Sequence, residues 1–225
     1  MNLYIVVEGE VGEKYLYQNW VPLVNPNLKY VQDISMIAEN NFSIISGGGF
    51  PSYYEVIESA IEDVNFYNTI DRLVIAIDSE DLSYSDKFNE MTEYLSQFKC
   101  KAETKIVIQH FCLETWALGN RQIVRTNPQS QKLIQYKKFY NVRSKDPELL
   151  PPYELEELNR AQFAEIYLRR ALNDKFRNLT YSKRNPKAIL HPKYFQRVKE
   201  RYEQTGHIKS FDYFLSAFNN FDEIP

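Results

Sequence analysis

Three carboxylates crowd the end of one apolar run in this sequence. The stretch RLVIAIDSED places Asp78, Glu80 and Asp81 directly after five apolar residues. Carboxylates next to a buried strand lose hydration and repel one another, so a positive charge is needed to hold them together. Mg²⁺ takes oxygen ligands of this kind. The alternative is that Asp78 caps the following helix while Glu80 and Asp81 face water.

A second apolar run, LYIVVE, also ends in an acid, Glu8. If the two runs form neighbouring parallel strands, Glu8 and Asp78 lie at the same edge of the sheet, where α/β proteins bind ligands. Acids that converge from separate parts of the chain favour a metal site over a helix cap. The candidate ligands are Glu8, Asp78 and Glu80, with Asp81 left open.

The stretch HFCLETWALG adds Glu114, an acid just past another expected strand. We interpret Glu114 as a further candidate at the same edge of the sheet. His110 and Cys112 are a candidate nucleophilic pair, but residues this close in sequence rarely form a working dyad. Cys112 is more simply a small buried residue, and Trp116 a core residue.

A basic loop, YSKRNPK, contains Lys183, Arg184 and Lys187. A lysine can stabilise the negative charge that develops during phosphoryl transfer, and this is the role considered for Lys183. All three are candidates for nucleic-acid binding. For Arg184 and Lys187 an exposed, solvated loop is the favoured alternative.

The glycine-rich segment SGGG, Ser46–Gly49, precedes an expected helix. Its backbone N–H groups could hold a phosphate at the helix N-terminus, or the glycines could simply form a left-handed turn. The Gly-Lys-Ser/Thr ending of a P-loop does not follow.

Elements that position these residues alternate between strand and helix over the first 120 residues. Apolar and β-branched runs predict strands, and apolar residues at spacings of three and four predict helices. The expected strands are 3–8, 29–34, 41–46, 72–78 and 104–111; the expected helices are 11–23, 52–67 and 85–98, with another starting near 112. This pattern predicts an α/β domain, residues 1–120, with a mainly parallel sheet flanked by helices.

Residues 121–225 are expected to form a mainly helical, basic region packed on that domain. Helices are predicted at 153–177, with Leu155 on the buried side, at 193–206, and at 210–218. Residues 1–120 contain 7 Lys and Arg against 18 Asp and Glu, whereas residues 121–209 contain 20 against 9. Such asymmetry favours a polyanionic partner, since Lys and Arg contact phosphates, although a solvated helical face is the simpler alternative.

Composition limits the class of protein. The chain of 225 residues is 44% hydrophobic, which is enough for a substantial core. No apolar run reaches the roughly 20 residues of a membrane span, the N-terminus lacks signal-peptide features, and two cysteines suggest neither a disulfide framework nor a zinc site. We therefore expect a cytoplasmic protein with no membrane association. The oligomeric state is open, a homo-oligomer included.

Together, YIVVEGE, SGGG and VIAIDSED resemble the TOPRIM fold, a Rossmann-like α/β fold. OLD-type nucleases share that fold. HFCLETWALG, YSK and the terminal SFDYF are more specifically similar to the small RloB- and AbiL-type TOPRIM-like proteins of bacterial anti-phage defence. The TOPRIM resemblance covers about the first 120 residues, and the finer one adds scattered motifs beyond them.

This resemblance implies a Mg²⁺- or Mn²⁺-dependent nuclease that works with an ABC- or SMC-like ATPase. It implies that Glu8 is a general acid/base or a metal ligand, that Asp78 and Glu80 are the acidic pair, that Glu114 is a further ligand and that Lys183 stabilises the transition state. Glu80 departs from the usual Asp. Two alternatives stay open: a non-catalytic TOPRIM-like binding module in a defence complex, and a nucleotidyl or phosphoryl transferase acting on small substrates. The substrate, DNA or RNA (tRNA included), is equally open.

Overall fold

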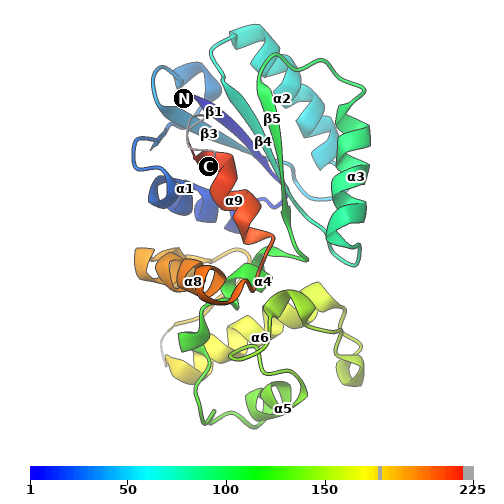
Figure 1. Ribbon diagram of the computed structural model, residues 1–225, viewed down its shortest axis with the longest axis vertical. Coiled ribbons are helices and arrows are strands. Elements are labelled where there is room, and N and C mark those ends of the chain that lie inside the picture. The colour runs from blue at the N-terminus through cyan, green and yellow to red at the C-terminus, as the bar shows by residue number, and fades with distance from the viewer. Residues whose placement is uncertain (177–178, 220–225) are drawn as a thin grey trace. The chain divides into compact units, whose positions relative to one another are not determined.

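The computed structural model describes residues 1–176 and 179–219, which divide into two compact units. The first unit comprises Met1–Ile77, Ser85–Ile108 and 213–219, and the second comprises Asp78–Tyr84 and Gln109–Asp212. The first unit contains the sheet and the second is helical (Figure 1). The expected α/β class with a helical C-terminal region is confirmed.

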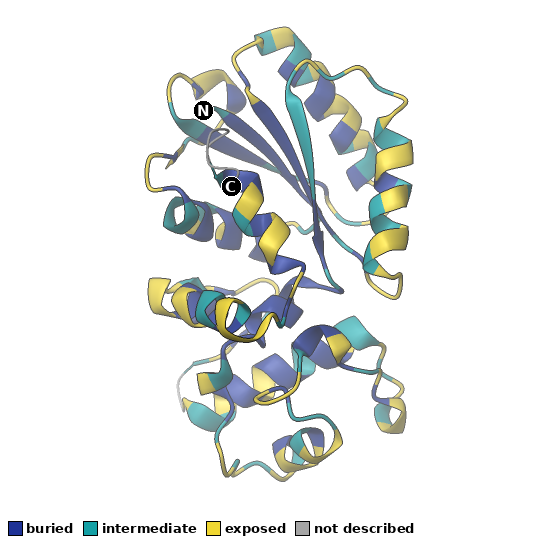
Figure 2. Ribbon diagram, in the orientation of Figure 1, coloured by how far each residue is buried: buried dark blue, intermediate teal, exposed yellow. Residues whose placement is uncertain are grey.

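A parallel sheet forms the core of the first unit, and in the described residues its strand order is β2-β3-β1-β4-β5. Val7 lies opposite both Ser46 and Ala76, because β1 pairs in parallel with β3 and with β4. Every residue of β1 is buried (Figure 2), which explains its unbroken apolar run. The strands are β1 Leu3–Val7, β2 Lys29–Tyr30, β3 Asn41–Ser46, β4 Arg72–Asp78 and β5 Glu103–Gln109.

Helices cover both faces of this sheet (Figure 1). On one face the Tyr17 ring packs edge-on against Phe214 with centroids 5.3 Å apart, which joins α1 to α9. On the other face Tyr54 packs against Tyr94 at 4.6 Å, which joins α2 to α3. The helices are α1 Gly12–Val24, α2 Tyr53–Tyr67, α3 Tyr84–Leu95 and α9 Phe211–Phe218.

An aromatic cluster and one buried arginine organise the second unit. Tyr136, Tyr153 and Phe163 pack with ring centroids about 5 Å apart. Arg201 is 1% exposed, and its guanidinium donates to the carbonyls of Val142 and Lys145, which replace its lost hydration. The helices are α4 Leu113–Ala117, α5 Gln131–Phe139, α6 Arg160–Lys175, α7 Lys187–Leu190 and α8 Pro192–Thr205, with 3₁₀ turns η2 Arg121–Ile123, η3 Pro147–Leu149 and η4 Glu154–Glu156.

The helix expected over 153–177 begins later than predicted, at Arg160. The Asn159 side chain accepts from the Gln162 N–H while the Gln162 side chain accepts from the Asn159 N–H, so a capping box fixes the start. Leu155, expected on the buried side, is 83% exposed in the η4 turn. The expected last residue, Arg177, lies outside the described residues.

The strand expected over 29–34 is also shorter than predicted. Only Lys29 and Tyr30 pair with β3, because the Asp33 side chain accepts from the Ser35 N–H and starts the 3₁₀ turn η1, Ile34–Met36. No helix in residues 1–176 and 179–219 combines the length and apolar character that a membrane span requires.

Candidate functional site

Asp78 is the last residue of β4, and the two residues that follow it are hydrogen-bonded to the chain at the end of β5. The Ser79 N–H donates to the carbonyl of Gln109 at 3.3 Å, and the Glu80 N–H donates to the carbonyl of Phe111 at 2.9 Å. α3 begins only at Tyr84, six residues after Asp78, so Asp78 does not occupy the cap position that the alternative gave it. Glu80 and Asp81 are exposed, as the same alternative expected.

Glu114 is a buried carboxylate held by a tyrosine. It lies in α4, is 1% exposed, and accepts a 2.6 Å hydrogen bond from the Tyr181 hydroxyl. Burial and the neighbouring Glu114 raise the pKa of Tyr181 well above its usual value. The hydroxyl therefore stays protonated and donates, which fixes the orientation of the Glu114 carboxylate.

Lys183 lies in a tight turn, and its side chain is exposed. The Asn185 N–H donates to the Ser182 carbonyl at 2.9 Å and to the Ser182 Oγ at 3.1 Å, which closes the turn. Glu114, and then Asp78, raise the pKa of Lys183 above its usual value, although the turn around it removes part of its hydration, which opposes the rise. Asp78, Glu114 and Lys183, all candidates from the sequence, belong to the second unit, and both acids act electrostatically on the lysine.

Two further members of this group were missed in the sequence analysis, Tyr181 and Glu165. Glu165 of α6 has a raised pKa because it is partly buried and close to Glu114, while Lys183 opposes the rise. Tyr181 is the first residue of YSK, two positions before Lys183, and this place in the motif was its sequence signal. We call Asp78, Glu114, Glu165, Tyr181 and Lys183 the Lys183 cluster.

The Lys183 cluster was tested for its fit to a divalent metal. Within the described residues, no group of three or more His, Cys, Asp or Glu side chains is placed to hold a metal ion. Mg²⁺, however, usually keeps several waters and binds one or two carboxylates together with substrate phosphate, rather than an all-protein cage. Asp78 and Glu114 supply oxygen ligands of that kind, so the donor chemistry fits Mg²⁺.

Glu8 belongs to the first unit, directly after β1. Its backbone N–H donates to the carbonyl of Ala76 at 3.1 Å, and the expected parallel pairing of the two acid-ended strands is confirmed. The role of Glu8 as a metal ligand stays a prediction from this pairing.

The glycine segment supports the end of β1. The Gly47 N–H donates to the carbonyl of Val7 at 2.7 Å, and the Gly49 N–H donates to that of Glu8 at 2.9 Å. Gly48 and Gly49 have φ of +73° and +83°, a left-handed backbone that favours glycine. Of the two readings of SGGG, these contacts fit the structural turn, because two of its N–H groups are used within the fold.

His110 and Cys112 do not form a nucleophilic pair. His110 Nδ1 lies 2.7 Å from the Ser79 hydroxyl, and burial together with Arg160 lowers its pKa to about 4, so the imidazole is neutral at pH 7. Cys112 is fully buried, and burial and Glu114 raise the pKa of its thiol. Trp116 is a core residue, as expected.

The remaining loop residues, Arg184 and Lys187, are exposed. Lys187 begins α7, whereas Arg184 sits beside Lys183 in the turn. Their exposure agrees with the solvated loop favoured for both.

Comparison with models of protein families, with curated proteins and with solved structures found no match to this chain.

Proposed function

We propose that this protein is a Mg²⁺-dependent nuclease that hydrolyses phosphodiester bonds of DNA or RNA. The observation that carries the proposal is the Lys183 cluster, in which the Tyr181 hydroxyl holds the buried Glu114 carboxylate at 2.6 Å, and Glu114 and Asp78 both act electrostatically on the exposed Lys183 ammonium. A cation among oriented carboxylates is a setting suited to phosphoryl transfer, which depends on positioning and charge stabilisation.

Asp78 and Glu114 would hold the metal, with Glu8 and Glu80 as the further ligands proposed from the sequence. When bound, Mg²⁺ supplies charge stabilisation and activation of water. Glu114 is oriented by the Tyr181 hydroxyl, so its oxygens need little rearrangement to meet a ligand. Lys183 would stabilise the negative charge that grows on the phosphate oxygens, because its ammonium stays protonated at any working pH.

The basic segment 121–209 would hold the nucleic-acid backbone. A role in bacterial anti-phage defence and an ABC- or SMC-like ATPase partner belong to the proposal through the TOPRIM resemblance alone.

The test is metal-dependent cleavage by the full chain and by an Asp78→Asn variant. Labelled DNA and total tRNA are incubated with each protein and Mg²⁺ or Mn²⁺, and thermal unfolding is followed with and without metal. We expect metal to stabilise the wild-type protein and to support cleavage, and Asp78→Asn to lose both effects. The polymer that is cut identifies the substrate.

Asp33→Asn is the matched control, because Asp33 is exposed in the η1 turn and an asparagine can accept the same hydrogen bond from the Ser35 N–H. If neither metal changes unfolding or yields cleavage, the nuclease proposal fails and the binding-module alternative takes its place.

A further inference from the structure

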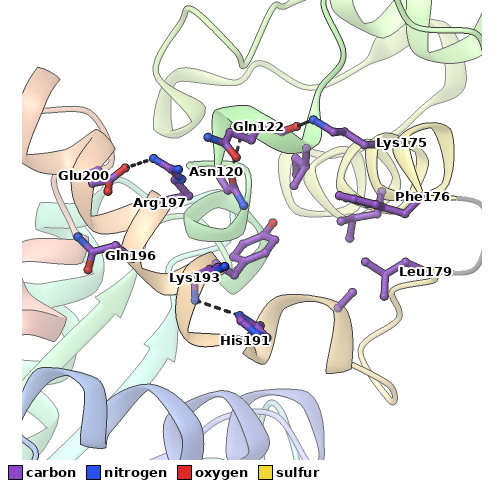
Figure 3. Close-up of a pocket in the computed structure, with 14 residues that line it drawn as sticks. Asn120, Gln122, Lys175, Phe176, Leu179, His191, Lys193, Gln196, Arg197 and Glu200 are labelled. Atoms are coloured by element: carbon purple, nitrogen blue, oxygen red, sulfur yellow. Dashed lines mark hydrogen bonds and ion pairs between the residues drawn. The ribbon is translucent and has the colours of Figure 1, made fainter.

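A second feature of the second unit is a pocket of about 630 Å³ between α6, α7 and α8. Figure 3 shows Phe176 and Leu179 on one side of it and Lys193 and Arg197 of α8 on the other. The volume falls within the range of roughly 300–1,000 Å³ that is usual for sites of small ligands. We call this the Lys193 pocket.

The rim of the Lys193 pocket carries more positive than negative charge. Among the described residues, Lys175, Lys193 and Arg197 line it, against a single acid, Glu200. Arg197 Nη1 donates to Glu200 Oε2 at 2.7 Å, so that pair is largely neutral. Lys175 Nζ donates to the Gln122 carbonyl, an uncharged acceptor that does not neutralise the ammonium.

Lys193 is the most available cation of the rim. It is exposed, and in the part of the chain that the structure describes its ammonium has no acceptor, whereas its backbone N–H donates to His191 Nδ1. A ligand anion that meets Lys193 and Lys175 would therefore not displace an existing carboxylate.

The other wall of the pocket is apolar and aromatic. Phe176 is 42% exposed, whereas Leu172 is fully buried and Tyr194 is 6% exposed, so a partly exposed aromatic ring lies beside a buried apolar base. The Lys175 ammonium lies 5.9 Å from the centroid of the Phe176 ring, which brings cation and ring together.

We propose that the Lys193 pocket binds one phosphorylated nucleoside, with its phosphate at Lys193 and Lys175 and its base against Phe176. This inference rests on the proposed function for the class of ligand, because an aromatic face beside lysines is how single-stranded nucleic acid is held without reading its sequence. A free mononucleotide and one unpaired nucleotide of a strand share this chemistry. The pocket would thus give the basic segment 121–209 one defined contact with a nucleotide.

The test is binding by the full-length protein in EDTA, so that no metal at the Lys183 cluster contributes. Calorimetry compares adenosine 5′-monophosphate, adenosine, inorganic phosphate, O-phosphotyrosine and a short single-stranded oligonucleotide. We expect the mononucleotide or the oligonucleotide to bind, and to bind more tightly than adenosine or phosphate. Comparable affinity for both assigns the pocket to a mononucleotide, and binding of the oligonucleotide alone assigns it to a strand.

Lys193→Glu and Phe176→Ala should each weaken this binding about tenfold or more. Lys199→Glu is the matched control, because it makes the same charge change on the same helix at a residue that does not line the pocket. Equal losses in Lys193→Glu and Lys199→Glu would reduce the effect to general electrostatics and overturn the proposal. Preference for O-phosphotyrosine, or no binding at all, would also overturn it.

The two proposals fail separately. Asp78→Asn should keep nucleotide binding in EDTA although it loses cleavage. If the pocket binds nothing while Asp78-dependent cleavage persists, only the pocket assignment is wrong.

Discussion

Two lysines of the second unit lie in opposite electrostatic surroundings. The ammonium of Lys183 is close to Glu114 and Asp78, which raise its pKa, and Glu165 adds to the effect. Lys193 has no carboxylate partner in the described residues, and the one acid in its pocket pairs with Arg197. Acids thus compensate the charge of Lys183, whereas no described carboxylate compensates that of Lys193.

The two surroundings suit different roles, stabilisation of charge during the reaction for Lys183 and binding of phosphate for Lys193. A lysine surrounded by carboxylates attracts a polyanion weakly from solution, yet it can stabilise charge on a phosphate once that phosphate is in place. A lysine beside an aromatic face and without an acid can attract the phosphate first. Net charge along a sequence cannot make this distinction, because it counts Lys183 and Lys193 alike.

The largest effect is expected from Glu8→Gln, which asks whether the chemistry needs an acid from the first unit as well. The change removes one carboxylate charge and keeps the shape of the side chain, so we expect cleavage to fall about 10³-fold or more with folding intact. Cleavage rates and circular dichroism are the measurements. Normal cleavage by a folded Glu8→Gln protein would confine the chemistry to the Lys183 cluster.

Lys183→Met is expected to lower cleavage by about 10²–10³-fold, the usual cost of losing one charge-stabilising donor. It should leave nucleotide binding in EDTA unchanged, since Lys183 does not line the Lys193 pocket. It should also lower thermal stability, because Glu114 and Asp78 lose their compensating cation, and Mg²⁺ should restore part of that loss.

Lys187→Met is the control for this variant, because Lys187 is exposed and close in sequence. If both substitutions affect cleavage equally, Lys183 has no special role. If Lys183→Met also abolishes nucleotide binding, the division between the two lysines is wrong.

The sheet was predictable because its signal is local. Leu3–Val7 and Arg72–Asp78 are unbroken apolar runs, and burial on both faces is what such runs require. The start of α6 was not predictable from periodicity, because the capping box at Asn159 overrides an apolar spacing that continues upstream to Leu155.

The candidate site was only partly predictable, for a related reason. Asp78 and Glu114 stand at ends of elements, where sequence patterns point to the edge of a sheet. Glu165 is in the middle of a helix and looks like any surface acid, and the bond from Tyr181 to Glu114 joins residues far apart in the chain. Such contacts depend on how the helices pack, which spacing does not encode.

The smallest predicted effect concerns Glu165 and the balance of charge in the Lys183 cluster. Its pKa is raised by burial and by Glu114, so the folded protein binds the proton more tightly than the unfolded chain does. The ionised carboxylate therefore lowers the stability of the fold. This loss is absent at pH values below the pKa of Glu165 in the unfolded chain, and it grows as the pH rises through the pKa in the folded protein.

Glu165→Gln should raise the unfolding temperature by about 1–2 °C near pH 8 without metal, and should leave it unchanged near pH 4. Thermal unfolding at the two pH values is the measurement. Glu154→Gln is the control, because Glu154 is an exposed acid in η4. A loss of stability near pH 8 would mean that the attraction of Lys183 for Glu165 outweighs the repulsion by Glu114, and that the cluster holds no surplus negative charge for a metal to neutralise.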